Sequence, residues 1–255
     1  MVFFKIIIPS YNNEWYIKKC LDSVLNQTFK DYEVVVVDDM STDNSVEIIK
    51  RYPFHLIELT EKRYNGGTRN VGIDYPIESE YTLFLDCDDW FHDEDVLKNL
   101  HKHLKKNPVD CLTLSYFIVY DNFEEMLPLK RNDRKTLVWD ACGACWTKCI
   151  KSKLIKKFPE GTLIEDTVQH INQCNYLKSF DSVSFPVVTY NRQNKNALTS
   201  KETIQNPSLK WQTSFLRYIA DLMELWCPDI DCEARRMERL ETAIKQLKEG
   251  KVFKW

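Results

Sequence analysis

Apolar runs alternate with amphipathic segments over the first ninety residues. The runs predict four strands buried on both faces, at 3–9, 32–37, 54–59 and 81–85. The segments between them predict helices, because apolar residues recur there at helical spacing; the first helix carries Trp15, Ile17, Cys20, Leu21, Val24 and Leu25. Strands that alternate with helices form right-handed crossovers and a mostly parallel sheet. The pattern therefore predicts an α/β fold.

Two polar stretches border these predicted helices. Ser41-Thr42-Asp43 is expected to cap the second helix. Asn65-Gly66-Gly67-Thr68-Arg69-Asn70 is expected to be a loop that leads into a third helix. This loop lacks the spacing of a dinucleotide fingerprint and of a P-loop. The sequence therefore argues against a nicotinamide dehydrogenase and a P-loop ATPase.

Polar side chains follow the predicted strands where each strand ends. Pro9-Ser10-Tyr11-Asn12 follows the first strand, Asp38-Asp39 the second and Asp86-Cys87-Asp88-Asp89 the fourth. The carboxyl ends of parallel strands meet at one edge, where α/β sheets bind ligands, so we expect the three clusters to converge. The alternative interpretation is that Asp88, Asp89 and Asp93 only cap a helix starting near Asp93.

The chemistry of this edge favours a nucleotide and a metal ion. A hard divalent cation held by oxygen ligands would relieve the repulsion among the carboxylates after the fourth strand. If strand geometry continues through Cys87, Asp86 and Asp88 point to one side and Cys87 to the other. Carboxylates also accept hydrogen bonds from ribose hydroxyls and base N–H groups. Arg69 offers a planar donor fork for phosphates, unless it forms an ordinary surface ion pair.

Composition narrows the class of protein. The chain has 255 residues, 44% of them hydrophobic, and a formal net charge of −3, so it can bury a sizeable core and shows no global basic field for nucleic acid. Its nine cysteines are an odd number, scattered, and fit reduced thiols in a cytoplasm. Cys142 and Cys145 have the spacing of half a zinc site, but no second pair completes it. No apolar run approaches the length of a membrane span.

The second half of the chain is harder to interpret. Residues 110–120 predict a further strand, and Trp146 is either a wall of the site or a core residue. Five lysines between 148 and 157 favour a solvated helix face, with contact to an anionic acceptor as the alternative. Residues 201–255 predict a helical extension of apolar, aromatic and mixed-charge stretches, which would pack on the core, shape an acceptor cleft or mediate a homodimer.

Several motifs, taken together, resemble family 2 of the inverting glycosyltransferases, which have the GT-A fold. They occur in the family's order over residues 3–200: Ile6-Ile-Ile-Pro9-Ser-Tyr11-Asn12, Val36-Val-Asp38-Asp39, Gly67-x-Arg69-Asn70, Leu85-Asp86-x-Asp88-Asp89, Trp146-Thr-Lys148, Glu165-Asp166-Thr167 and Pro186-Val-Val-Thr-Tyr190-x-Arg192. The resemblance implies a GT-A domain at 1–200, with a nucleotide-sugar half at 1–107 and an acceptor half at 108–200.

The resemblance also implies roles for single residues. Pro9, Tyr11, Asn12, Asp38, Asp39, Arg69, Asp86 and Asp88 would bind the nucleotide sugar, and Asp88 with the competing Asp89 would hold Mn²⁺ or Mg²⁺. Asp166 would be the catalytic base and Glu165 its neighbour, although both acids also suit an ordinary helix N-terminus. Trp146 and Arg192 are weaker acceptor candidates. Some relatives supply a metal-binding His after the Tyr-x-Arg motif; residues 191–196 contain none, which leaves Asn196, water or no third ligand.

The expected activity is metal-assisted sugar transfer with inversion, from a nucleoside diphosphate (UDP favoured) to a hydroxyl of a saccharide or lipid-linked glycan. A hydroxylated DNA base is an alternative acceptor. A nucleotidyltransferase and a non-catalytic nucleotide-sugar-binding module are alternative functions, but the first would more naturally carry a glycine-rich loop after the first strand, and the second would be expected to lose Asp-x-Asp or Glu165-Asp166. We expect a cytoplasmic location, compatible with peripheral contact at the inner membrane face.

Overall fold

The computed structural model describes residues 1–120, 124–127, 144–160, 165–174 and 176–194. By its internal contacts the chain divides into two units, residues 1–161 with 165–193, and residues 162–164 with 194–255. All helices and strands given below belong to the first unit. The expected helical extension at 201–255, and with it the boundary after residue 200, lies outside the described residues and stays a prediction.

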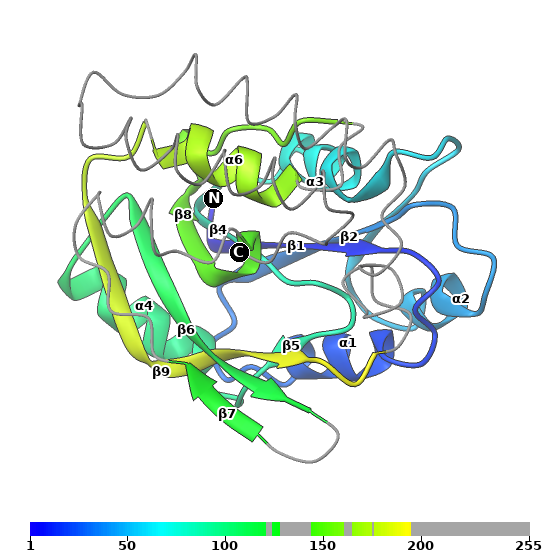
Figure 1. Ribbon diagram of the computed structural model, residues 1–255, viewed down its shortest axis with the longest axis horizontal. Helices are drawn as coiled ribbons and strands as arrows, with labels where there is room; N and C mark the ends of the chain where they lie inside the picture. Colours follow the sequence, from blue (N-terminus) through cyan, green and yellow to red (C-terminus); the bar gives the residue numbers. More distant parts are fainter. Residues whose placement is uncertain (121–123, 128–143, 161–164, 175, 195–255) are drawn as a thin grey trace, which may run out of the picture. The chain divides into compact units, whose positions relative to one another are not determined.

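The first unit is built on one mixed sheet of nine strands, ordered β3-β2-β1-β4-β8-β6-β9-β5, with β7 paired to β6 (Figure 1). The strands are β1 Val2–Ser10, β2 Tyr32–Asp38, β3 His55–Glu58, β4 Ser79–Phe84, β5 Trp90–Phe91, β6 Cys111–Val119, β7 Glu124–Leu127, β8 Lys148–Lys151 and β9 Phe180–Asn191. The first four are parallel neighbours, as predicted. Antiparallel β8 joins them to β6, which runs parallel to β9.

Helices cover both faces of the parallel strands. They are α1 Ile17–Leu25, α2 Ser45–Ile49, α3 Tyr64–Asp74, α4 Val96–Lys106 and α6 Glu165–Cys174, with short 3₁₀ turns η1 Cys145–Thr147 and η2 Ser152–Leu154. Figure 1 shows α3 and α6 together on one side of β1 and α1 on the other. Alternation along β1 explains the two layers: Phe4, Ile6 and Ile8 join the core cluster that contains the apolar face of α1, and Ile7 packs toward α3.

The glycine stretch is not the loop we expected. Gly66 and Gly67 lie in the first turn of α3, where close packing requires glycine. A Cβ on Gly66 would lie 2.6 Å from the carbonyl oxygen of Pro159, and one on Gly72 would lie 2.5 Å from Cγ2 of Ile7. Tertiary packing thus overrides the low helix propensity of glycine and brings α3 close to β1 and to residues 158–160.

Three further expectations need correction. Strand β4 ends at Phe84, so Asp86 to Asp89 form a turn and not the extended run that would alternate their side chains. Helix α4 begins at Val96, and Asp89 contacts β9 instead of capping that helix. The lysine-rich stretch forms β8 and η2 and not a helix face. Within the described part of the chain, no helix combines the length and the apolar character needed to cross a bilayer.

Candidate active site

A buried arginine gathers three carboxylates at the edge formed by the strand ends. Arg69, in α3, donates from Nη1 to Oε1 of Glu165 at 2.9 Å and to Oδ1 of Asp166 at 3.0 Å, and from Nη2 to Oδ1 of Asp86 at 2.7 Å. Its side chain is 2% exposed. The fork geometry of the guanidinium explains why one arginine can bind acids from two distant parts of the chain. The sequence pattern had suggested phosphates or a surface ion pair for Arg69.

The three carboxylates differ in their access to solvent. The side chains of Asp86 and Asp166 are 27% and 25% exposed, whereas that of Glu165 is 6% exposed. Burial, followed by the charge of Asp166, raises the pKa of Glu165 to about 7, although Arg69 opposes the shift. One guanidinium cannot balance three ionised carboxylates, so this edge accepts further positive charge or holds a proton on Glu165 at neutral pH.

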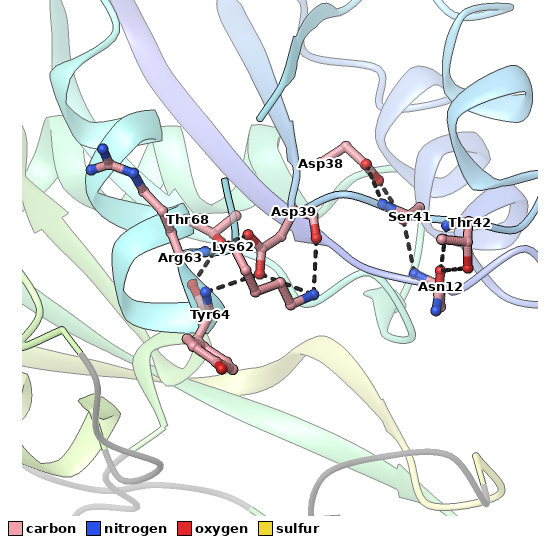
Figure 2. Close-up of polar contacts among 9 residues, drawn as sticks. All are labelled: Asn12, Asp38, Asp39, Ser41, Thr42, Lys62, Arg63, Tyr64 and Thr68. Atoms are coloured by element: carbon pink, nitrogen blue, oxygen red, sulfur yellow. Dashed lines mark hydrogen bonds and ion pairs between the residues drawn. The ribbon is translucent and has the colours of Figure 1, made fainter. Parts of the chain in front are cut away.

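A second cluster, shown in Figure 2, surrounds Asp39 at the end of β2. The backbone N–H groups of Arg63 and Tyr64 donate to its two carboxylate oxygens at 2.7 and 2.9 Å. Lys62 Nζ lies 3.2 Å from Asp39 Oδ2 and donates to the Asp39 carbonyl at 2.9 Å. The same ammonium lies over the ring of Tyr11, which is 48% exposed. Asp39 therefore fixes the start of α3 and keeps a cation and an aromatic ring beside it.

Asp38 and Asn12 hold the neighbouring turns together. Oδ1 and Oδ2 of Asp38 accept hydrogen bonds from the hydroxyl and the N–H of Ser41 (Figure 2). The N–H of Asn12 donates to the Ser41 hydroxyl at 2.9 Å, and its Oδ1 accepts from the N–H of Thr42 at 2.7 Å. These contacts hold the loops that follow β1 and β2 against each other, and direct roles of Asp38 and Asn12 in nucleotide binding stay predictions.

The turn after β4 offers oxygen atoms that suit a hard cation. Asp88 is partly exposed, whereas Asp89 is fully buried. Oδ1 of Asp89 accepts the N–H of Asn191 at 2.8 Å, and its Oδ2 is buried without a hydrogen-bond partner. In the described residues, no three His, Cys, Asp or Glu side chains converge as a complete metal site. Mg²⁺ and Mn²⁺ commonly bind through one or two carboxylates plus phosphates and water, so the donor set fits such an ion.

The remaining candidates lie at different depths. Pro9 is buried within β1, one residue before its end. Trp146 is 4% exposed and packs between Tyr116 and Tyr190, with ring centroids 4.9 and 5.1 Å away. This is the position of a core residue. Arg192 is exposed, and its Nη1 donates to the hydroxyl of Tyr190 at 3.0 Å. Acceptor roles for Trp146 and Arg192 stay predictions, and Asn196 lies outside the described residues.

Sequence reasoning missed Lys62 and Tyr64. In the part of the chain that the structure describes, three non-glycine residues have positive φ, and all three follow strands at this edge: Asn12 at 46°, Met40 at 64° and Tyr64 at 58°. Such conformations cost energy and cluster at functional sites. Nothing in the amino-acid types of Met40 or Tyr64 signals a left-handed backbone, so this feature of the site could not be found from the sequence.

Comparison with known proteins gives the family. The family model "Glycosyl transferase family 2" matches residues 5–179, well over half of the chain. The chain belongs to this family. Glycosyltransferase GlyA of Streptococcus pneumoniae is 32% identical over 203 residues, which are 68% of this chain and 28% of GlyA. Poly(ribitol-phosphate) β-N-acetylglucosaminyltransferase TarP of Staphylococcus aureus is 36% identical over 119 residues, 44% of this chain and 36% of TarP.

Solved structures confirm the predicted fold class of this family 2 chain. Residues 1–349 of S. aureus TarS, in complex with UDP-GlcNAc, superpose with a TM-score of 0.72 at 19% identity, over 99% of this chain and 93% of that one. The fold is thus the GT-A fold, with a mixed sheet and flanking helices. The chain spans only about a quarter to a third of the length of GlyA and TarP.

Proposed function

We propose that the chain transfers a sugar from a nucleoside diphosphate to an acceptor hydroxyl, with inversion at the anomeric carbon. The observation that carries the proposal is the Arg69 cluster: a guanidinium binds Asp86, from the strand edge of the nucleotide half, and Asp166, from α6. This contact brings a candidate donor-binding carboxylate and a candidate base to opposite arms of one rigid fork. A single displacement needs this arrangement, because donor and base must face the same reacting hydroxyl.

Asp166 is the better base of the neighbouring pair. A general base must reach the proton that it removes, and the Asp166 side chain is 25% exposed whereas that of Glu165 is 6% exposed. Arg69 orients Asp166 through Oδ1, and in this proposal Oδ2 accepts the proton of the acceptor hydroxyl. Glu165 holds Arg69 from the buried side and acts as a positioning residue.

Asp88, with the unpartnered oxygen of Asp89, would hold the divalent ion that we predict. When bound, Mn²⁺ or Mg²⁺ supplies a Lewis acid that stabilises negative charge on the departing diphosphate. A family structure supports this choice, since the mannosyltransferase PcManGT of Pyrobaculum calidifontis was solved with GDP-Man and Mn²⁺, although its 20% identity and TM-score of 0.59 show only a shared fold.

The nucleoside end offers both kinds of hydrogen-bond partner to a base edge. Asp39 offers a hydrogen-bond acceptor and Lys62, 3.2 Å away, a donor. Uracil, thymine and guanine present an N–H beside a carbonyl, and cytosine presents an amino group beside a ring acceptor, so each of these bases can satisfy the pair. The exposed ring of Tyr11 provides a surface on which the base can stack. UDP is our choice within this set, because the TarS structure contains UDP-GlcNAc.

A glycan hydroxyl is the acceptor that the relatives support best. TarP and TarS are named as poly(ribitol-phosphate) β-N-acetylglucosaminyltransferases. We therefore propose a saccharide or polyol-phosphate chain as the acceptor of this protein too. The alternative of a DNA base drew on the lysine-rich stretch and on the basic terminal helix, which lies outside the described residues. In the structure Lys148 is buried, Lys151 pairs with Asp110 at 3.1 Å and Lys157 with Asp74 at 2.7 Å, so these lysines do not form one open basic face.

Turnover of a nucleotide-sugar panel tests this proposal. The protein is incubated with Mn²⁺ and UDP-, GDP-, dTDP- or CDP-sugars, with and without poly(ribitol phosphate), and released nucleotide is measured. We expect release from UDP-sugars, and loss of that release when EDTA removes the ion, restored by Mn²⁺. Release that is indifferent to EDTA would contradict the metal role, and absence of release from every UDP-sugar would contradict the choice of UDP.

A further inference from the structure

Lys5 is a buried lysine in the middle of the sheet, away from the strand edge that carries the active site. It lies in the first half of β1 on the face toward α3 and is 3% exposed. Its Nζ donates to the carbonyl of Ile73 at 3.0 Å and to that of Tyr75 at 2.7 Å. These carbonyls belong to the last turn of α3 and to its C-cap, so Lys5 caps the C-terminal end of the helix that begins at Tyr64 and carries Arg69.

The surroundings of Lys5 make the loss of its proton easier than for an exposed lysine. Burial lowers its pKa to about 8, although Asp74 opposes the shift. Asp74 itself pairs with Lys157 at the surface. The other charged residues at the same pocket are Glu78 and Lys153. A neutral amine has two N–H groups and one lone pair. Both N–H groups are used by the two carbonyls, so the lone pair occupies the remaining tetrahedral position.

A pocket of about 330 Å³ lies next to this amine. Its wall includes three hydroxyls, with Ser152 Oγ 2.7 Å from Ser79 Oγ and 2.9 Å from Thr82 Oγ1. Each of the three hydroxyls has one proton, and the two contacts between the hydroxyls use two of these protons. One hydroxyl proton is therefore left to donate to another acceptor. Ile73, Ile77 and Ile155 give the same pocket an apolar wall. A nucleophile, a hydrogen-bond donor and an apolar wall therefore meet in one small cavity.

We propose that Lys5 is a site of covalent acylation by an acyl phosphate. The amine attacks the carbonyl carbon, a C–N bond forms, and the bond from that carbon to the phosphate oxygen breaks. Phosphate leaves with the electron pair, and the amine loses one proton to solvent. The hydroxyls of Ser79, Thr82 and Ser152, which line the same pocket as Lys5, would donate to the carbonyl oxygen as it gains negative charge. The amide keeps one N–H, so only one of the two α3 carbonyls retains its donor.

Competitive labelling tests this proposal. The native protein is treated briefly with acetyl phosphate over a range of pH, and acetylation of each lysine is measured by peptide mass spectrometry. At about pH 7.5, a lysine of pKa about 8 has roughly 200 times the free-amine fraction of an ordinary lysine. Allowing for its lower intrinsic nucleophilicity, we expect Lys5 to react about tenfold faster than Lys153, which lines the same pocket.

Two further readouts make the result decisive. The rate at Lys5 should level off above about pH 8 while the rate at Lys153 continues to rise, and the difference should vanish when urea unfolds the chain. A Ser152→Ala variant should slow labelling of Lys5 and leave that of Lys153 unchanged. Labelling of Lys5 at or below the rate of Lys153 in the native protein would overturn the proposal. None of these readouts depends on sugar transfer.

Discussion

The Asp166→Asn variant is expected to bind the donor as the wild type does and to lose sugar transfer by about 10²- to 10⁴-fold, the usual contribution of a general base. The asparagine oxygen can still accept the hydrogen bond from Nη1 of Arg69, so the cluster should keep its geometry. What the variant lacks is the second carboxylate oxygen, which in our proposal takes the proton of the acceptor. Released nucleotide measured at saturating donor and acceptor gives the rate, and calorimetric titration of UDP gives the affinity.

Asp181→Asn is the matched control, since Asp181 pairs with His103 at 2.8 Å, outside the Arg69 cluster. It should transfer sugar at the wild-type rate. Glu165→Gln should fall between the two, because glutamine keeps an oxygen for Arg69 and removes only a buried charge. If Asp166→Asn turns over within a factor of three of the wild type, Asp166 is not the base.

The second large effect is on stability. Removing the guanidinium in Arg69→Met leaves Glu165 and two partly buried aspartates without their shared cation. Breaking a buried ion pair from one side typically costs about 3–5 kcal/mol, because the remaining charge stays desolvated. For a chain of this size that corresponds to a fall of roughly 10 °C in Tm. Thermal and urea unfolding, followed by circular dichroism, measure the loss.

Arg192→Met provides the control, since Arg192 is an exposed arginine. We expect its stability to stay within about 0.5 kcal/mol of the wild type. Adding Glu165→Gln to Arg69→Met should recover part of the loss, because the most deeply buried unpaired charge is then gone. An Arg69→Met protein as stable as the wild type would mean that the arginine does not hold the carboxylates together in solution.

Much of the fold followed from local pattern. Continuous apolar runs located β1 to β4, and their alternation with helices gave parallel order, because both signals depend on near neighbours in the chain. The glycines of α3 could not be placed in the same way. Their helical conformation depends on the carbonyl of Pro159 and on the side chain of Ile7, which are distant in sequence. Propensity alone therefore favoured a loop.

The candidate site, like the fold, has features that the sequence predicts and features that depend on residues distant in the chain. The acids at strand ends were visible in the sequence, and topology alone brings them to one edge. The ion pair between Arg69 and Glu165 could not be predicted from the sequence, because the two residues are 96 positions apart and no local pattern connects them. The structure shows different burial for Glu165 and Asp166, and likewise for Asp88 and Asp89. Exposed fractions of neighbouring acids are properties of the packed structure and cannot be deduced from residue type.

Calorimetric titration of UDP in the presence of Mn²⁺ tests most directly whether separate carboxylates form one nucleotide site. We expect one UDP site per chain. We also expect Asp39→Asn and Asp88→Asn, whose side chains come from different strand ends, each to weaken UDP binding by about tenfold or more, as is usual for the loss of a charged hydrogen bond or a metal ligand. Absence of UDP binding to the wild type, or wild-type affinity in both variants, would contradict this expectation.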